Sequence, residues 1–345
     1  MGVRALGKRG LAAALRTTGL TALGRARRRR SAVVLTYHGV LPAGRRHDPY
    51  LSRNCVDDDV FLAQMSFLRN HYNCVPLADI VDCLTTGRML PPRTAAVTFD
   101  DGFRNNYTHA LPALKATGVP ATVFVATGHI GHGCLMLWTE RVAWLMQVAP
   151  ANVDTVPVGD TAVAVDLSSP EARRQSSRRL LKQLKGTTAE VRDVAIAWLD
   201  AAARVAGTPS PDADRYAFMD WSEVKALAAS GLVDIGSHTV THLLLATGTR
   251  ERRQAELQES KREIEQHVGR PCRLFAYPNG TAADFDESDK RVLRQLGYAA
   301  AVTQVPGVNG RDADLYALRR YNVSRGHALD TMAAMLAGTW PAGRT

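Results

Sequence analysis

Long hydrophobic runs, paired cysteines and a basic protein body are all missing from this sequence of 345 residues. No stretch approaches the roughly 20 apolar residues that a membrane-spanning helix needs. The cysteines form no Cys-x-x-Cys pair; they are Cys55, Cys74, Cys83, Cys134 and Cys272. An odd and scattered set is typical of reduced, mostly buried thiols rather than of a disulfide framework, and it favours a cytosolic location.

The positive charge is concentrated at the N-terminus. Residues 1–30 contain nine Lys and Arg and no acid, so the formal net charge of +10 leaves only +1 for the rest of the chain. A nucleic-acid groove needs Lys and Arg spread over the folded surface. We therefore expect no nucleic-acid partner.

The basic leader, residues 1–30, fits three interpretations. Arginines flank Leu11, Leu15, Leu20 and Leu23, a pattern typical of an amphipathic helix on an anionic membrane surface. A disordered basic tail is the alternative. A secretory signal is disfavoured because arginines lie on the wrong side of the apolar segment, although the sequence leaves export open.

Apolar strands and helical segments alternate along residues 31–335. Segment 136–215 differs, because it is rich in Arg and Ala, and we predict a helical insertion there. Residues 336–345 are predicted as a C-terminal tail. The strands predicted from apolar runs are 32–37, 94–99, 121–125, 232–235, 274–277, 298–303 and 318–323. Repeated strand–helix units predict an α/β fold with a parallel sheet or barrel.

Polar residues that can bind a metal follow two of these strands. Asp100 and Asp101 come directly after strand 94–99, and His238 and His242 follow strand 232–235. We expect the four-residue spacing to place both imidazoles on one side of a helical turn. Two imidazoles and a carboxylate at strand ends suit a divalent metal with an open coordination position.

Three motifs in this order resemble those of the polysaccharide deacetylases, carbohydrate esterase family four. They are Thr98-Phe99-Asp100-Asp101-Gly102, His238-Thr239-Val240-Thr241-His242 and Phe275-Ala276-Tyr277-Pro278-Asn279-Gly280. Segments 34–40 and 219–224 resemble the branch that contains bacterial poly-N-acetylglucosamine deacetylases. The resemblance implies a distorted (β/α) barrel and a metal-dependent hydrolase that removes N-acetyl groups from N-acetylhexosamine units.

The resemblance also implies roles for individual residues. Asp101, His238 and His242 would bind the metal, and Asp100 would be the catalytic base. The chemistry agrees with this division, because a Zn²⁺-like ion activates both water and carbonyl, while an unligated carboxylate takes the proton. Zinc suits these ligands best, and cobalt, nickel or iron would fit too. The oxyanion would be held by the metal and by a backbone N–H near Tyr277, as in the family.

Two departures from the family pattern leave roles open. The arginine that usually precedes the third motif is missing, and we expect Arg320 to supply its charge from a later strand. The late Leu-x-His motif is missing as well, so the general acid is unassigned. Its candidates are His38, His327 and a proton relay through Asp100.

Substrate contacts are predicted for Trp221, Pro278 and Asn279, although a tryptophan at a helix start is equally a core anchor. The expected partner is an N-acetylated glycan, polymeric or lipid-linked, in cell-envelope or exopolysaccharide assembly. We expect the protein in the cytoplasm or bound peripherally to the inner face of a bacterial membrane. The alternatives are a catalytically weakened carbohydrate-binding protein on the same fold, and a scaffold that binds anionic lipid or nucleic acid through residues 1–30.

Overall fold

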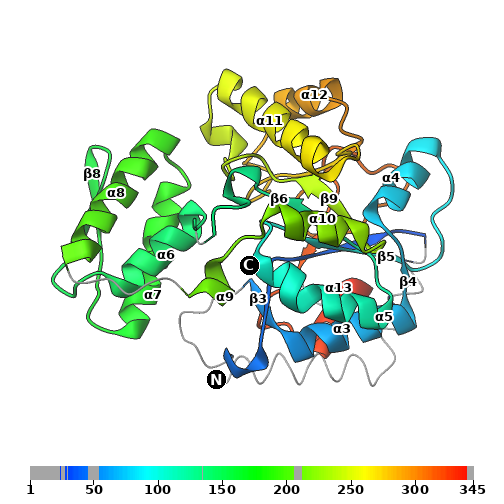
Figure 1. Ribbon diagram of the computed structural model, residues 1–345, viewed down its shortest axis with the longest axis horizontal. Coiled ribbons are helices and arrows are strands. Elements are labelled where there is room, and N and C mark those ends of the chain that lie inside the picture. Colours follow the sequence, from blue (N-terminus) through cyan, green and yellow to red (C-terminus); the bar gives the residue numbers. More distant parts are fainter. Residues whose placement is uncertain are drawn as a thin grey trace.

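A curled parallel sheet surrounded by helices forms the body of the computed structural model (Figure 1). The structure describes residues 30–45, 54–133, 135–205 and 212–339, together with Gly24 and Arg28. The main strands follow the order β11-β10-β9-β6-β5-β1-β12, and β4 pairs with β5. Their bounds are β1 Val33–Tyr37, β4 Asn73–Cys74, β5 Thr94–Phe99, β6 Ala121–Val125, β9 Val233–Ser237, β10 Leu274–Ala276, β11 Ala300–Val302 and β12 Tyr321–Asn322.

Residues 318–322 connect the two ends of this sheet. Leu318 forms a parallel bridge with Val302 of β11, and Tyr321 pairs with Leu35 of β1. The Thr303 N–H donates to the Leu318 carbonyl at 2.8 Å. The sheet therefore curls into a distorted barrel, which confirms the predicted fold class.

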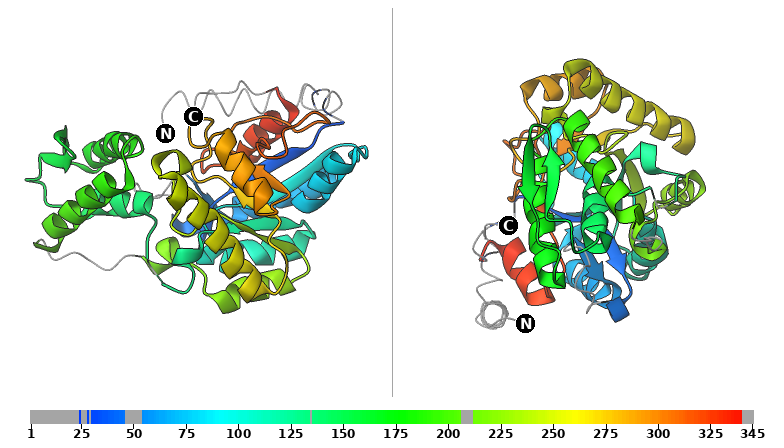
Figure 2. Two further views of the ribbon diagram at one scale, coloured as in Figure 1. Left: turned by 90° about the horizontal axis from the view of Figure 1, so that it is seen from above. Right: turned by 90° about the vertical axis from the view of Figure 1, so that its left-hand side faces the viewer.

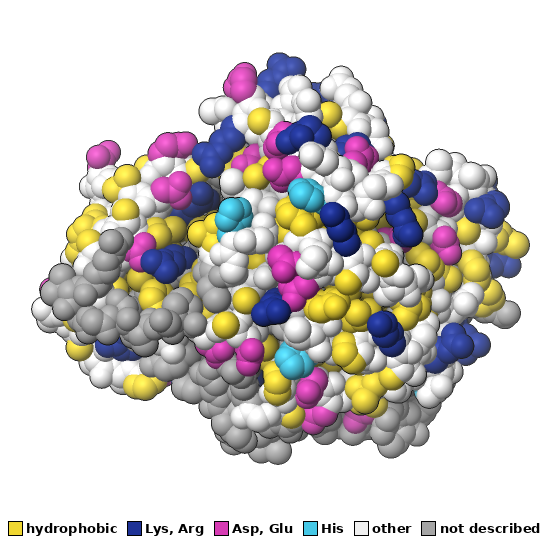
Figure 3. Space-filling model, in the orientation of Figure 1, with side chains coloured by type: hydrophobic (Ala, Val, Ile, Leu, Met, Phe, Trp, Pro, Cys, Tyr) yellow, Lys and Arg dark blue, Asp and Glu magenta, His cyan; other side chains and the backbone are white. Residues whose placement is uncertain are grey.

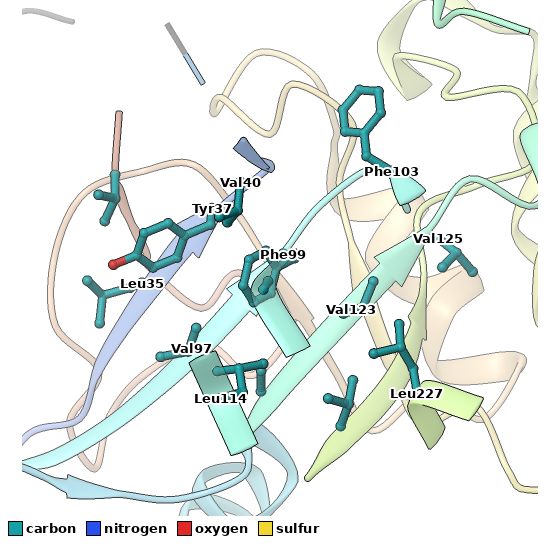
Figure 4. Packing of buried hydrophobic residues seen from close by; sticks show 14 of the residues in the cluster. Leu35, Tyr37, Val40, Val97, Phe99, Phe103, Leu114, Val123, Val125 and Leu227 are labelled. Carbon is teal, nitrogen blue, oxygen red and sulfur yellow. The ribbon is translucent and has the colours of Figure 1, made fainter. Parts of the chain in front are cut away.

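The sheet forms from these segments because both faces of each central strand are buried. All residues of β1 and β5 are buried, so these strands are nearly continuous apolar runs, as expected for a covered parallel sheet. In Figure 4, Phe99 of β5 and Val123 of β6 lie between strand and helix side chains that include Leu114 and Leu227. Each buried side chain of this size contributes roughly 1.5–3 kcal/mol of transfer free energy.

Helices cover the outside of the barrel. They are α3 Asp58–His71, α4 Leu77–Thr86, α5 Leu111–Thr117, α10 Trp221–Ala229, α11 Arg250–Val268, α12 Glu287–Gln295 and α13 Leu329–Ala337. The predicted boundary between barrel and tail at residue 336 is wrong, because it falls inside α13. The short parallel pair β2 Gly39–Leu41 and β3 Cys55–Asp57 lies beside the barrel strands.

The predicted insertion stands to one side of the barrel in Figures 1 and 2. Its elements are α6 Trp138–Val148, β7 Thr155–Val158, β8 Thr161–Ala164, α7 Pro170–Leu184, α8 Ala189–Val205 and α9 Ala213–Tyr216. The insertion is mostly helical, and it also contains an antiparallel hairpin of β7 and β8 that was not predicted. The two-residue turn Gly159-Asp160 between Val- and Ala-rich runs is the signal for it.

The insertion has its own hydrophobic core, which includes Leu145, Leu180 and Leu199. One barrel residue contributes to that core: Leu244, in the loop that follows β9. The next residue, Leu245, packs into the main barrel core instead. This loop therefore ties the insertion to the barrel.

None of the described helices is long and apolar enough to cross a membrane. The predicted leader, residues 1–30, lies outside the described residues except for Gly24, Arg28 and Arg30. On the face drawn in Figure 3, Lys and Arg are interspersed with Asp and Glu and form no continuous basic stripe.

Candidate metal centre and catalytic carboxylate

Asp101, His238 and His242 meet at the carboxyl ends of β5 and β9, which are separated only by β6. One ligand atom from each residue lies within 4.8 Å of the other two. The Asp101 Oδ1 is 3.5 Å from the Nε2 of both histidines. All three side chains are buried. The predicted ligand set therefore comes together in space.

The backbone around these ligands is unusual. Asp101, Thr239 and His242 have positive φ angles of 78°, 66° and 56°. This left-handed region is uncommon for residues other than glycine and is concentrated at functional sites. The two histidines are therefore joined by an irregular loop, and the expectation of a helical turn between them is wrong.

A carboxylate from α11 holds this loop in place. The Glu256 Oε2 accepts hydrogen bonds from the backbone N–H groups of Val240 and Thr241 at 2.8 and 2.9 Å. Its Oε1 accepts from the Thr241 hydroxyl at 2.6 Å. These bonds offset the cost of the strained backbone, which is on the order of 1–3 kcal/mol per residue.

The orientation of the two imidazoles suits a metal. The Nδ1 of His238 donates to the Ala276 carbonyl at 2.7 Å, which directs the lone pair of its Nε2 towards Asp101. Burial would lower the pKa of His238, but the carboxylates of Asp101 and Asp100 raise it above its usual value. Burial and the neighbouring His238 lower the pKa of His242 to about 3, so this ring is neutral at physiological pH.

Asp101 itself remains ionised. Burial would raise the pKa of its carboxyl, but hydrogen bonding to His238 and the nearby imidazoles hold it well below its usual range. An ionised carboxylate with two converging imidazole nitrogens is the donor set of a three-ligand zinc site. The residues present therefore fit a divalent metal.

Asp100 is outside the ligand cluster and forms a buried ion pair with Arg320. The guanidinium donates to Oδ1 and Oδ2, each at 2.7 Å, and its Nε donates to the Thr303 carbonyl at 2.8 Å. Burial would raise the pKa of Asp100, but Arg320 outweighs it and keeps that pKa below the usual value. Arg320 thus supplies the charge that the third motif lacks, as predicted.

Gln304 is a site residue that the sequence reasoning missed. Its Nε2 donates to the Asp100 Oδ2 at 3.0 Å, from a position just after β11. The carboxylate therefore accepts three hydrogen bonds, and about four acceptor positions are available to it. One position remains for the proton of a water molecule. The only sequence signal for a role of Gln304 is its position directly after the predicted strand 298–303.

His38 follows β1 and lines a small cavity together with Asp101. Its Nδ1 is buried and has no hydrogen-bond partner among the described residues. His327 lies in a different environment, because its Nδ1 accepts from the Ser324 N–H at 3.0 Å within its own loop. Of the two histidine candidates for the general acid, only His38 lines the cavity beside Asp101.

The Tyr277 side chain packs in the core, so the predicted oxyanion contact near Tyr277 would have to come from the backbone. Its hydroxyl donates to the Tyr316 carbonyl at 3.0 Å, and its ring stacks on Phe285. Its backbone N–H donates to the Val302 carbonyl within the sheet. Pro278 is buried and has no N–H, so the next backbone donor in this motif is that of Asn279.

The remaining predicted substrate residues have partners within the protein. The Asn279 side chain donates to Asp284 at 2.7 Å and accepts from Lys185 of the insertion. The Trp221 ring stacks on His267 of α11, with ring centroids 4.1 Å apart. Trp221 therefore packs as a core anchor, the alternative named above, and the structure gives no support for its predicted substrate contact.

Comparison with known proteins gives consistent results. Residues 87–301 match the family model described as polysaccharide deacetylase. The putative polysaccharide deacetylase YxkH of Bacillus subtilis is 23% identical over 267 residues, 77% of this chain and 64% of the relative. The poly-beta-1,6-N-acetyl-D-glucosamine N-deacetylase of Staphylococcus epidermidis is 31% identical over 114 residues, 29% of this chain and 38% of the relative. The chain thus spans less than two thirds of these curated relatives.

Solved structures share the fold. The Streptococcus pyogenes deacetylase PplD, in complex with acetate, superposes with a TM-score of 0.57 at 15% identity, covering 89% of this chain and 99% of that one. IcaB from Ammonifex degensii gives 0.55 at 21% identity, with coverage of 89% and 97%. The family model covers more than half of the chain and includes Asp101 and both histidines. The chain belongs to the polysaccharide deacetylase family.

Proposed function

We propose that this protein is a metal-dependent hydrolase that removes N-acetyl groups from N-acetylhexosamine units of a glycan. One observation carries the proposal: three buried metal-binding side chains converge beside a carboxylate that a buried arginine keeps ionised. The Staphylococcus epidermidis relative, whose name specifies poly-N-acetylglucosamine, supports a polymeric substrate of exopolysaccharide assembly. A lipid-linked precursor with the same amide is a second substrate to test.

Asp101, His238 and His242 would hold the ion, for which zinc is the best fit. When bound, such an ion polarises the amide carbonyl and acidifies a water molecule to a pKa of about 7. Asp100 then accepts the proton of the water, because Arg320 keeps its carboxyl ionised and one acceptor position is open. The Asn279 N–H is the oxyanion donor that we propose, since the Tyr277 N–H is engaged in the sheet.

His38 is the proposed general acid. It lies on the same small cavity as Asp101, and its Nδ1 has no protein partner among the described residues. A catalytically weakened carbohydrate-binding protein is less well supported, because binding alone would not need a buried, bidentate Arg320 to orient an acid.

Acetate release tests this proposal directly. We expect the purified protein to release acetate from poly-N-acetylglucosamine or from a lipid-linked N-acetylhexosamine. A chelator should lower that rate by at least about 100-fold, and added zinc should restore it. His238→Ala should remove both bound metal and activity. Full activity in metal-free protein would contradict metal dependence, and metal-loaded protein without turnover on any glycan would favour the binding alternative.

We also propose that the protein lies on the inner face of a bacterial membrane. A surface hollow of about 200 Å³ is lined by Arg30, Arg88 and Arg311, and no acidic residue among the described ones lines it. Its neighbour Met89 is 83% exposed. Arg30 precedes β1 and Arg88 precedes β5, and Arg311 is two residues after Asn309, whose backbone pairs with Ala32 just before β1. The hollow therefore lies at the edge of the sheet opposite the metal centre. The basic leader adjoins Arg30 in sequence.

Sedimentation with lipid vesicles tests this membrane contact. We expect the full chain to bind phosphatidylglycerol vesicles and not phosphatidylcholine vesicles, with binding that weakens as salt increases. Arg88→Gln and Arg311→Gln should each reduce binding about five-fold, because a surface arginine contributes about 1 kcal/mol. Arg291→Gln, on an exposed position of α12, is the matched control. Binding that survives the double substitution would limit the contact to the leader.

A further inference from the structure

A small polar cavity beside the metal centre is lined by His38 and Asp101 and also by two charged residues that have no role in the chemistry proposed above. Its volume is about 20 Å³. The barrel contributes His38 and Asp101, and the insertion contributes Glu140 and Arg215. The insertion therefore reaches the place where the amide would be cleaved.

The two ends of the insertion deliver these two residues. Glu140 lies in the first turn of α6, and Arg215 lies in α9, the last helix of the insertion (Figure 1). α9 is fastened to the loop that follows Asp101. The Asn105 side chain donates to the Asp214 carbonyl at 3.3 Å, and the backbone after α9 pairs with that of residues 102–104. The position of Arg215 is thus coupled to that of Asp101.

The charged side chains of Glu140 and Arg215 are energetically costly to bury at this cavity. Arg215 is only 7% exposed, and its guanidinium lies over the Tyr216 ring, 4.6 Å from the centroid. Glu140 is half-buried within the electrostatic range of Arg215 and Asp101. A charged group withdrawn from water costs several kcal/mol unless it is paired. The Glu140 carboxylate near Asp101 therefore does not stabilise the fold, which points to a functional role for it.

The size and polarity of the cavity limit what it can accept. A volume of about 20 Å³ holds one water-sized group. A carboxylate accepts hydrogen bonds and a guanidinium donates them, so a hydroxyl group, which does both, matches this wall. The methyl of an acetyl group has the size but cannot make either bond.

We propose that Glu140 and Arg215 form a recognition site for one hydroxyl of the sugar unit whose acetamido group is hydrolysed. Glu140 accepts a hydrogen bond from this hydroxyl, and Arg215 donates to the hydroxyl oxygen. The insertion thereby determines which hexosamine is accepted. The inference rests on the proposed deacetylase function.

Two substrates separate recognition from chemistry. One is an oligomer of N-acetylglucosamine, and the other is a small aryl acetate that has no sugar hydroxyl. We expect Glu140→Gln to lower kcat/KM on the oligomer about 10- to 100-fold, the range for a hydrogen bond to a charged group. The aryl acetate rate and the metal content should stay unchanged, and the unfolding midpoint should not fall. Glu190→Gln, an exposed glutamate on α8 of the insertion, is the matched control.

Monodeoxy analogues of the oligomer identify the hydroxyl and distinguish Glu140 from His38. The wild type should lose rate on one analogue, and Glu140→Gln should cause no further loss on it. His38→Gln, which removes the proposed general acid, should lower kcat on every analogue. Arg215→Lys should weaken the oligomer reaction in the same selective way.

Two results would overturn the inference. One is an equal loss on the aryl acetate, which would make Glu140 a support of the metal centre. The other is an unchanged oligomer rate in Glu140→Gln. A wild-type protein that cleaves aryl acetate but no glycan would instead refute the proposed function, so the two failures are distinguishable.

Discussion

Asp100→Asn should lower the rate of acetate release by about 10²- to 10⁴-fold, the contribution of a positioned general base. The bound metal should remain, because Asp100 is not part of the three-residue ligand cluster. The variant should also unfold more easily, since Arg320 is fully buried and would lose its carboxylate partner. Removing one partner of a buried ion pair costs up to about 3–5 kcal/mol.

Three measurements on one preparation check this prediction: single-turnover acetate release, metal content by mass spectrometry and urea-induced unfolding. Asp101→Asn is the matched control, because it alters the adjacent acid and should lose the metal together with the activity. An Asp100→Asn variant as active as the parent protein would show that another group takes the proton from water.

Replacing Arg320 by methionine should move the acidic limb of the pH–rate profile to higher pH. In the parent protein Arg320 holds the pKa of Asp100 below its usual value, so the base stays ionised in mildly acidic solution. Without the guanidinium, only the nearby imidazoles of His238 and His38 oppose the effect of burial, so the pKa of Asp100 rises. The base is then protonated at a higher pH, and activity is lost earlier as the pH falls.

The same substitution should lower the free energy of unfolding at neutral pH by about 3–5 kcal/mol. A depressed carboxyl pKa contributes stability above the unfolded-state pKa, and this stability is lost as the pH falls through the folded-state pKa. The difference between Arg320→Met and the parent should therefore shrink in acid. Arg319→Met, an exposed neighbour, is the control. Equal pH profiles for the Arg320 variant and the parent would rule out this electrostatic role.

The central strands and the two acidic site residues could be predicted because their signals are local. β5 and β6 are short apolar runs that end near polar residues. All their residues are buried, so few secondary-structure assignments other than a strand are possible for them. Asp100 and Asp101 directly follow β5. Arg320 could be predicted because a positive charge is expected beside the base, and the predicted late strand 318–323 carries this arginine.

The remaining features depend on contacts between distant segments. Four-residue spacing does not distinguish a helical turn from the loop that carries His238 and His242, because Glu256 on α11 fixes that loop. Gln304 and Glu140 reach the site through the packing of whole elements. The engagement of the Tyr277 N–H depends on the strand register, which a single sequence does not specify.

The attachment of the insertion has a mechanical consequence. Leu244, which packs into the insertion's core, is only two residues from His242, a candidate metal ligand. Trimming the insertion would therefore not be neutral for the barrel, because it would expose Leu244 and loosen the anchor of His242. A change in how the insertion packs on the barrel would therefore alter the position of His242, whereas a change on its outer surface would not.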